Sequence, residues 1–322
     1  MELTAVTFFD LVREELQAME AQLRTTIPAE PEVLHTTVAR LINAGGKRLR
    51  PALALLAGRL FECDLDQAVY VAAAVETLHT ATLVHDDLVD GSLLRRGMRT
   101  LNAQWSPAVT VLTGDYLFAR AAGFAAQANS IAVVREFTNA LQVIVTGEIN
   151  QMFAGRGQAS REAYLTRIYA KTAVLFALSA HTPALIGCGD ELVGEALRTY
   201  GREIGMAFQI MDDILDFTGD EAKLGKPVGS DLRQGLFTLP ALCYLESRPD
   251  DADLNSLLNG SRNARTLARV TQAIRQSSAI GAARREAEAY VARAHAALAG
   301  VPDNAYRRAL HEMADYVIRR NL

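Results

Sequence analysis

The sequence predicts an all-α fold, built as one bundle of ten or more helices. Apolar residues recur every three or four positions through most of the 322 residues, which is the spacing of one face of a helix. No segment alternates apolar and polar residues over the length of a strand. Several of the expected helices are apolar on all sides, which indicates that they lie in the centre of the bundle.

Prolines and glycines divide the chain into successive expected helices. An amphipathic helix over 4–26 ends at Pro28, and the next, 33–42, stops at Gly45 and Gly46. Further helices are expected at 52–60, 67–90, 109–129, 131–153, from Ser160 to before Pro183, and at 191–217, 238–246, 265–277, 279–298 and 304–318. We expect a single domain over 1–322, in which 247–261, rich in Pro, Asp, Asn and Gly, is an exposed insertion.

Composition excludes several classes of protein. The formal net charge is -4, and the basic residues form no long run, so we do not expect nucleic-acid binding. The cysteines Cys63, Cys188 and Cys243 are far apart and match no zinc or redox spacing, which favours a reducing, cytoplasmic location. The N-terminus lacks a basic segment followed by an apolar one, and no apolar run reaches the roughly 18 residues of a transmembrane helix.

Three aspartates, Asp86, Asp87 and Asp90, stand at the C-terminal end of an otherwise apolar helix. Asp86 and Asp90 are one turn apart and share a face, and His79 falls on the same stripe. Carboxylates gathered at a helix C-terminus repel each other, and the helix dipole adds to this repulsion. We therefore expect positive charge beside them, from Arg95, Arg96 or a divalent metal ion.

The same Asp-Asp-x-x-Asp spacing returns at Asp212, Asp213 and Asp216, with Gln209 one turn earlier. Clusters with oxygen donors alone suit Mg²⁺ or Mn²⁺. Magnesium is usually held by one or two carboxylates, and substrate phosphates complete its shell. One such motif is most often a solvated helix end. Two copies on apolar helices, each followed by basic residues, favour metal-assisted binding of a diphosphate.

Basic residues also occupy places that suit an anion. Lys47 and Arg50 follow Gly45-Gly46 at the start of a helix, where cations oppose the helix dipole unless an anion is bound there. A solvated basic turn is the alternative interpretation. Lys171 lies in an apolar setting, and a buried lysine needs a partner.

Together these motifs resemble those of the trans-isoprenyl diphosphate synthases, or polyprenyl synthetases, and most resemble the medium- and long-chain all-trans enzymes. The resemblance runs from Gly45 to the C-terminus and rests on five motifs: Gly-Gly-Lys-Arg-Leu-Arg-Pro, the first aspartate motif with Arg95-Arg96-Gly97, Lys171-Thr172, Phe208–Asp216 and Gly225-Lys226-Pro227. It implies an isoprenoid synthase fold with helices around a central active-site cavity. It also implies a Mg²⁺-dependent prenyltransferase, which joins isopentenyl diphosphate to an allylic diphosphate and releases diphosphate.

The resemblance implies a role for each matching residue. Asp86 and Asp90 would bind Mg²⁺ with Asp87 beside them, and Asp212 would bind a further ion with Asp213 and Asp216 in support. The implied metal ligands are Asp86, Asp90, Asp212 and Asp216. About three Mg²⁺ are implied per active site, with Mn²⁺ as a substitute. The allylic diphosphate would contact Arg95, Lys171, Thr172, Gln209 and Lys226. Isopentenyl diphosphate would contact Gly46, Lys47, Arg50, His79 and Arg96. The aspartates Asp86, Asp87, Asp90, Asp212 and Asp213 would be catalytic together with Lys171 and Lys226.

Two positions depart from the family's pattern. Leu236 and Phe237 stand where a lysine is common, and Gln234 replaces a common glutamate. We expect one diphosphate contact to be missing and no metal ligand to be lost. The resemblance also implies a homodimer, for which the apolar stretch Val109–Phe124 is a candidate interface, although a place in the core explains this stretch equally well.

Small residues before the first aspartate motif bear on product length. Ala81 and Thr82 are expected on the same face as Asp86, one turn deeper, and a large aromatic side chain there would close the path of the growing chain. Its absence predicts a tunnel between this helix and those that carry Phe118, Val145 and Met152, and a medium or long product. A short-chain farnesyl or geranylgeranyl diphosphate synthase is the alternative.

Three other classes of protein share features of this sequence. A non-catalytic regulatory subunit of a synthase should lose aspartates from one motif, and both are complete here. A class I terpene cyclase usually has an Asn/Ser/Glu-based second metal motif. A helical interaction protein with acidic helix ends is distinguished from a synthase by its inability to lengthen a chain.

Overall fold

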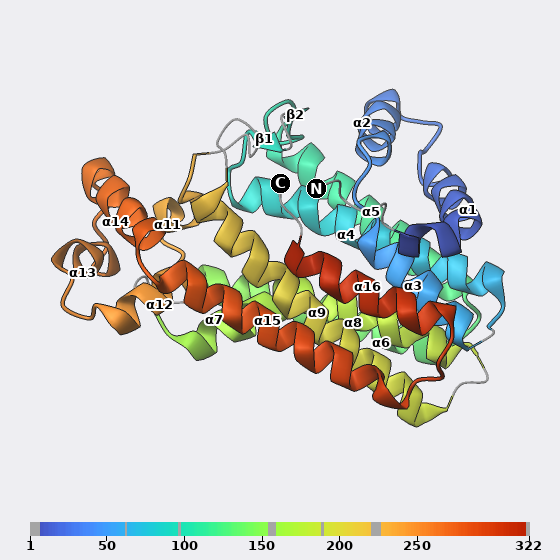
Figure 1. The fold of residues 1–322 in the computed structure, drawn as a ribbon. Coiled ribbons are helices and arrows are strands. Elements are labelled where there is room, and N and C mark those ends of the chain that lie inside the picture. The colour runs from blue at the N-terminus through green and yellow to red at the C-terminus, as the bar shows by residue number, and fades with distance from the viewer. Residues whose placement is uncertain are drawn as a thin grey trace. The chain divides into compact units, whose positions relative to one another are not determined.

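The computed structural model describes residues 7–61, 63–95, 98–153, 159–187, 190–219 and 227–319, and it confirms the all-α prediction (Figure 1). The α-helices are α1 Arg13–Arg24, α2 Glu32–Asn43, α3 Leu49–Leu60, α4 Leu65–Val89, α5 Pro107–Gln127, α6 Ile131–Phe153, α7 Arg161–Ile168, α8 Val174–His181, α9 Glu191–Thr218, α11 Ser230–Gln234, α12 Leu239–Ser247, α13 Ala252–Leu258, α14 Ala264–Gln276, α15 Ala279–Ala297 and α16 Ala305–Arg319. Short 3-10 helices occupy Thr7–Val12, Thr182–Leu185 and Leu298–Gly300. None of the described helices is both long enough and apolar enough to cross a membrane.

The chain divides into two compact units. The first unit comprises Met1–Ala140, Leu175–Gly201 and Ala297–Met313, and the second comprises Leu141–Val174, Arg202–Ala296 and Ala314–Leu322. Helices α6 and α9 each contribute residues to both units. The single domain expected over 1–322 stays a prediction.

The first unit is built on α3 and α4, which are buried on most sides. Helix α4 packs against α1, α3 and α5, and its residues from Ala68 to Leu78 are almost all buried. It begins at Asp64, whose carboxylate accepts a hydrogen bond of 2.8 Å from the backbone N–H of Asp66, so one of the unsatisfied donors of the first turn gains a partner. The start of this largely buried helix is therefore capped by its own sequence.

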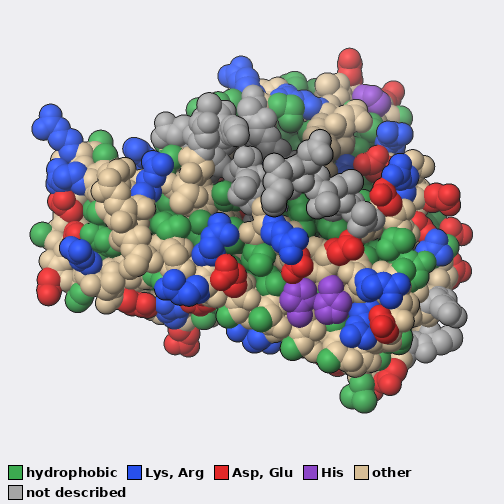
Figure 2. Space-filling view, viewed as in Figure 1, with side chains coloured by type: hydrophobic (Ala, Val, Ile, Leu, Met, Phe, Trp, Pro, Cys, Tyr) green, Lys and Arg blue, Asp and Glu red, His purple; other side chains and the backbone are tan. Residues whose placement is uncertain are grey.

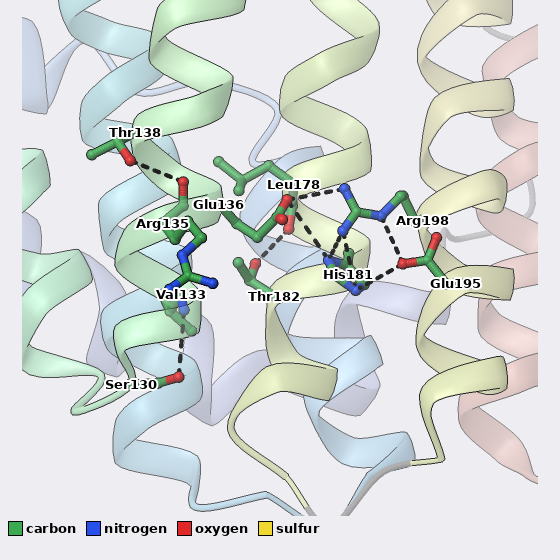
Figure 3. Close-up of polar contacts among 10 residues, drawn as sticks. All are labelled: Ser130, Val133, Arg135, Glu136, Thr138, Leu178, His181, Thr182, Glu195 and Arg198. Carbon is green, nitrogen blue, oxygen red and sulfur yellow. Dashed lines mark hydrogen bonds and ion pairs between the residues drawn. The ribbon is translucent and has the colours of Figure 1, made fainter.

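A network of charged side chains joins α6, α8 and α9 inside the first unit (Figure 3). Arg198 donates to Glu136 at 2.9 Å and to Glu195 at 3.1 Å, and its Nη2 lies 2.8 Å from Nδ1 of the buried His181. Burial lowers the pKa of His181, and the adjacent Arg198 cation lowers it further. The neutral imidazole accepts from the guanidinium, so the buried His181 has a hydrogen-bond partner without carrying a second positive charge.

The second unit has a core formed by the C-terminal half of α9 with α7, α12, α13, α14 and α15. The segment 247–261, expected to be an exposed insertion, contains α13, in which Leu254 and Leu257 are 0% and 2% exposed. Tyr244 donates a hydrogen bond of 2.8 Å to Asp251, the residue that caps α13. The ends of this segment are exposed as expected, but its two inward leucines belong to the core.

Two local features were not expected from the sequence. A hairpin pairs Leu94–Arg95 with Met98–Arg99, and its strands are too short to show any alternation. The helical run after Ser160 is interrupted by a π-helical turn at Tyr169–Ala173. Such turns are found frequently at functional sites.

The face of the molecule that Figure 2 shows carries charged side chains of both signs. On the face shown in Figure 2, basic and acidic side chains are interspersed without a large patch of one sign. This distribution agrees with the small net charge of the chain.

Close packing in the first unit depends on Gly201. A methyl group at this position of α9 would overlap the backbone carbonyl of Phe176 in α8, and backbone cannot move aside as a side chain can. We predict that Gly201→Ala lowers the free energy of unfolding by about 1–3 kcal/mol through overpacking, as measured by urea denaturation. The matched control is Gly281→Ala in α15, where the methyl group would meet only Arg285 at 3.6 Å. This control should be neutral or up to about 1 kcal/mol more stable, because alanine favours helix. Equal effects at the two positions would contradict the packing argument.

Candidate active site

An accessible stripe runs along the buried helix α4. His79, Thr82 and Asp86 are half-buried and Asp90 is exposed, whereas Ala81, Val84 and Asp87 are buried. Residues seven, four and eleven positions apart return to nearly the same side of a helix. Asp86 and Asp90 therefore lie on the same accessible face as His79, as their spacing predicts. Their roles in binding stay predictions.

Asp87, the middle aspartate, is held inside the first unit. The β1–β2 hairpin brings Arg95 back to the helix end, where its Nε donates to Asp87 Oδ1 at 2.8 Å. Burial raises the pKa of Asp87, and the Arg95 cation opposes this rise. Arg95 is thus the positive charge that the acidic helix end was expected to need. Arg96 lies outside the described residues.

The basic turn before α3 is anchored by a cation that sequence reasoning did not single out. Arg48 adopts a left-handed conformation with φ of 49°, as Gly45 does with φ of 64°. Its Nη1 lies 2.5 Å from Oε1 of the buried Glu76 of α4. Gly46 and Lys47 are exposed, and the Arg50 guanidinium lies over the Phe176 ring at 4.6 Å. The Arg48–Glu76 ion pair therefore fixes the turn to α4 and leaves Lys47 at the surface.

In the second unit, the π-helical turn carries Lys171 and Thr172. Lys171 Nζ lies 2.9 Å from Oε1 of Glu148 in α6, so the partner that the sequence required is Glu148. Gly147 permits the close approach of α6, because a methyl group there would lie 2.5 Å from the Cβ of Ala170. The glycine beside Glu148 and the π-helical turn together position this ion pair.

Thr172 begins a chain of hydrogen bonds that ends in the core of the second unit. The Thr172 hydroxyl donates to Gln209 Oε1 at 2.7 Å, and Gln209 Nε2 donates to Asp213 Oδ1 at 2.9 Å. Tyr164, which is buried, donates from its hydroxyl to the other oxygen, Asp213 Oδ2, at 2.7 Å. Burial raises the pKa of Asp213 to about 8, and the charge of Asp231 contributes to the same rise. Tyr164 was expected only as a helix residue, and nothing in its spacing marks it as part of a site.

The aspartates of the second motif occupy different surroundings. Asp212 is half-buried, whereas Asp213 and Asp216 are 3% and 2% exposed. Asp216 Oδ2 accepts from the backbone N–H of Asp231 at 3.3 Å, which connects the end of α9 to α11. Gly225 and Lys226 lie outside the described residues. Phe237 is buried and Leu236 half-buried, so neither offers a charge at the position where a lysine is common.

Comparisons with known proteins agree with these observations. Residues 31–276 match the family model described as polyprenyl synthetase. The chain is 37% identical to heptaprenyl diphosphate synthase component 2 of Geobacillus stearothermophilus over 97% of this chain and 98% of that protein. It is 34% identical to octaprenyl diphosphate synthase of Escherichia coli (strain K12), with the same coverage of 97% and 98%.

Solved structures show the same relationship. A polyprenyl synthase from Caulobacter crescentus CB15, crystallised with calcium and isoprenyl diphosphate, matches with a TM-score of 0.92 and 37% identity, over 99% of both chains. A heptaprenyl diphosphate synthase from Staphylococcus aureus matches with a TM-score of 0.90 and 33% identity, over 97% of this chain and 99% of that one. The predicted resemblance is confirmed: the chain belongs to the polyprenyl synthetase family and is a prenyltransferase.

Proposed function

We propose that this prenyltransferase joins isopentenyl diphosphate to an allylic diphosphate, head to tail and in the trans geometry, and makes a medium- or long-chain polyprenyl diphosphate. The observation that carries this proposal is the pair of accessible carboxylates, Asp86 and Asp90, one turn apart at the end of a buried helix. The names of the heptaprenyl and octaprenyl relatives support a product of this length.

We propose Mg²⁺ as the metal, held by Asp86 and Asp90 in the first unit and by Asp212 in the second. In the parts of the chain that the structure describes, no three Asp, Glu, His or Cys side chains converge as a metal-binding group. This suits an ion that takes one or two carboxylates and completes its shell with water and phosphate oxygens. Asp216 is buried and accepts a backbone hydrogen bond, so a supporting role fits it better than direct coordination. The calcium in the Caulobacter structure supports a divalent ion.

Bound metal would neutralise the diphosphate and make it a better leaving group. The chain's own part is to orient both substrates and to set fixed charges toward the departing oxygen atoms. Lys171 and Arg95 are held by Glu148 and Asp87, so their positions are set before substrate arrives, and Lys226 would add a third cation. Lys47, Arg50, His79 and Arg96 would bind isopentenyl diphosphate. The departing diphosphate would accept the proton that the new bond releases.

A second copy of the chain is proposed as partner. In the stretch Val109–Phe124, Leu117 and Phe124 are buried, whereas Val111 and Leu112 are 39% and 66% exposed. The stretch thus combines a core face with an exposed apolar face, and such a face suits an interface. The word "component" in the name of the Geobacillus relative supports a heteromer as the alternative.

Chain extension tests the reaction directly. With Mg²⁺, farnesyl diphosphate and labelled isopentenyl diphosphate, the protein should yield lengthened prenyl chains, and chelation of the metal should stop this. Asp86→Asn and Asp90→Asn should each lower kcat/KM by at least about 100-fold, because each removes a carboxylate that would hold the Mg²⁺ needed to stabilise the leaving group. Asp66→Asn, at the opposite end of α4, removes the same charge and should have no effect. Failure of the wild-type protein to extend any allylic primer would contradict the proposed reaction.

Substitution of Thr82 tests product length better than substitution of Ala81. Ala81 is 0% exposed and lies roughly 140° round the helix from Asp86, whereas Thr82 lies within roughly 40° of it. A phenylalanine at Ala81 is therefore expected to overpack the core first. Thr82→Phe should narrow the accessible stripe below the aspartates and shorten the products, as measured by chromatography of the dephosphorylated chains. Thr80→Phe, roughly 120° away from Asp86 on the same helix, should leave product length unchanged. Identical product lengths from the wild type, Thr82→Phe and Thr80→Phe would exclude the stripe as the path of the growing chain.

A further inference from the structure

The buried end of the hydrogen-bond chain in the second unit is made by Tyr164 and Asp213. Both oxygens of Asp213 are engaged, one by the Tyr164 hydroxyl at 2.7 Å and the other by the Gln209 amide at 2.9 Å. Tyr164 is 1% exposed and Asp213 3%. The carboxyl group of Asp213 is buried with both oxygens engaged by protein partners, whereas Asp212, the preceding residue, is half-buried and keeps accessible surface.

The direction of each hydrogen bond follows from the acceptor at the buried end. Because Asp213 accepts from Gln209 Nε2, the amide oxygen of Gln209 faces the other way and accepts from the Thr172 hydroxyl at 2.7 Å. The orientation of the amide and the direction of the hydroxyl proton are therefore determined by Asp213. One N–H of Gln209 remains to meet an acceptor outside this chain of bonds.

The π-helical turn lies between the two residues that contact α9. Tyr164 and Thr172 are eight residues apart, and eight residues of regular α-helix would leave their side chains roughly 80° out of line. The turn at Tyr169–Ala173 holds more residues than an α-helical turn, so it returns Thr172 toward α9. Tyr164 then reaches Asp213 while Thr172 reaches Gln209, one turn of α9 earlier.

We propose that Tyr164 and Asp213 are positioning residues, which set the Gln209 amide and the Thr172 hydroxyl for the allylic diphosphate, and that Asp213 serves this role in place of metal coordination. The inference rests on the proposed function, in which Gln209 and Thr172 contact that substrate. It assigns a function to Tyr164, and it separates Asp213 from the neighbouring Asp212 in the same motif.

The first experiment removes only the tyrosine hydroxyl, in the full-length chain. Tyr164→Phe should lower kcat about 10-fold, since small misplacements of a positioned group are costly to the reaction, and the thermal midpoint should stay nearly unchanged. The matched control is Tyr244→Phe, since Tyr244 is also buried but donates its hydroxyl hydrogen bond, at 2.8 Å, to Asp251, which lies outside the Thr172–Gln209–Asp213–Tyr164 hydrogen bonds. The control should keep full activity.

A double-mutant cycle tests whether Tyr164 acts through Gln209. In a Gln209→Ala background, Tyr164→Phe should have little further effect on kcat, because the two substitutions interrupt the same series of hydrogen bonds. If each substitution lowers kcat by the same factor whether or not the other is present, the proposal is overturned. An active wild-type enzyme with an equally active Tyr164→Phe variant would overturn it too, and would leave the proposed function intact.

The dependence on Mg²⁺ separates positioning from metal coordination, and it still decides the question if the tyrosine variant fails to fold. Asp213→Asn keeps an acceptor for Tyr164 but places an amide donor against the amide nitrogen of Gln209. The side-chain amide of Gln209 must then flip. We expect a lower kcat with an unchanged Mg²⁺ concentration for half-maximal activity. Asp212→Asn should raise that concentration several-fold. A rise as large in Asp213→Asn as in Asp212→Asn would show Asp213 to be a metal ligand and would overturn the proposal.

Discussion

The fold depends on protein partners for the carboxylates that are buried near the C-terminal ends of two helices. Helices α4 and α9 each bury most of their surface and each carry an Asp-Asp-x-x-Asp motif near the C-terminus, where the helix dipole disfavours negative charge. In each unit the second aspartate of the motif is buried, and in the second unit Asp216 is buried as well. Asp87 receives Arg95, and Asp213 receives Tyr164 and Gln209. These two aspartates are satisfied by protein groups, which leaves Asp86, Asp90 and Asp212 with accessible surface.

Helical spacing explains why much of this arrangement follows from sequence alone. The positions of the helices and the shared face of His79, Asp86 and Asp90 depend only on residues close together in the chain. The same spacing limits the argument about product length: Ala81 and Thr82 are adjacent and both small, yet only Thr82 lies near the face of Asp86. Residue size alone does not distinguish them, whereas burial does.

What could not be predicted are the partners that come from distant parts of the chain. Lys171 was expected to need a counter-charge, but Glu148 is 23 residues away on another helix. Arg48 was one basic residue among several, and its ion pair with Glu76 depends on how α3 packs against α4. The π-helical turn has no marker in the sequence, and α13 was missed because two buried leucines in a short polar segment resemble an exposed loop. Each of these features depends on residues far apart in the sequence or on local backbone geometry. The spacing of apolar residues along the chain reports neither.

Asp213 also has an energetic consequence. Its pKa in the folded chain is about 8, against an ordinary value of 3.8, so the folded state holds this proton more tightly than the unfolded state does. Its burial therefore weighs increasingly against stability as the pH rises from 3.8 to about 8. An apolar residue of similar size would avoid that penalty, but it would leave the Gln209 amide and the Tyr164 hydroxyl without their acceptor. Residues that reduce stability while they fix the geometry of others are expected at functional sites, and this gives the buried carboxylate a physical reason to be there.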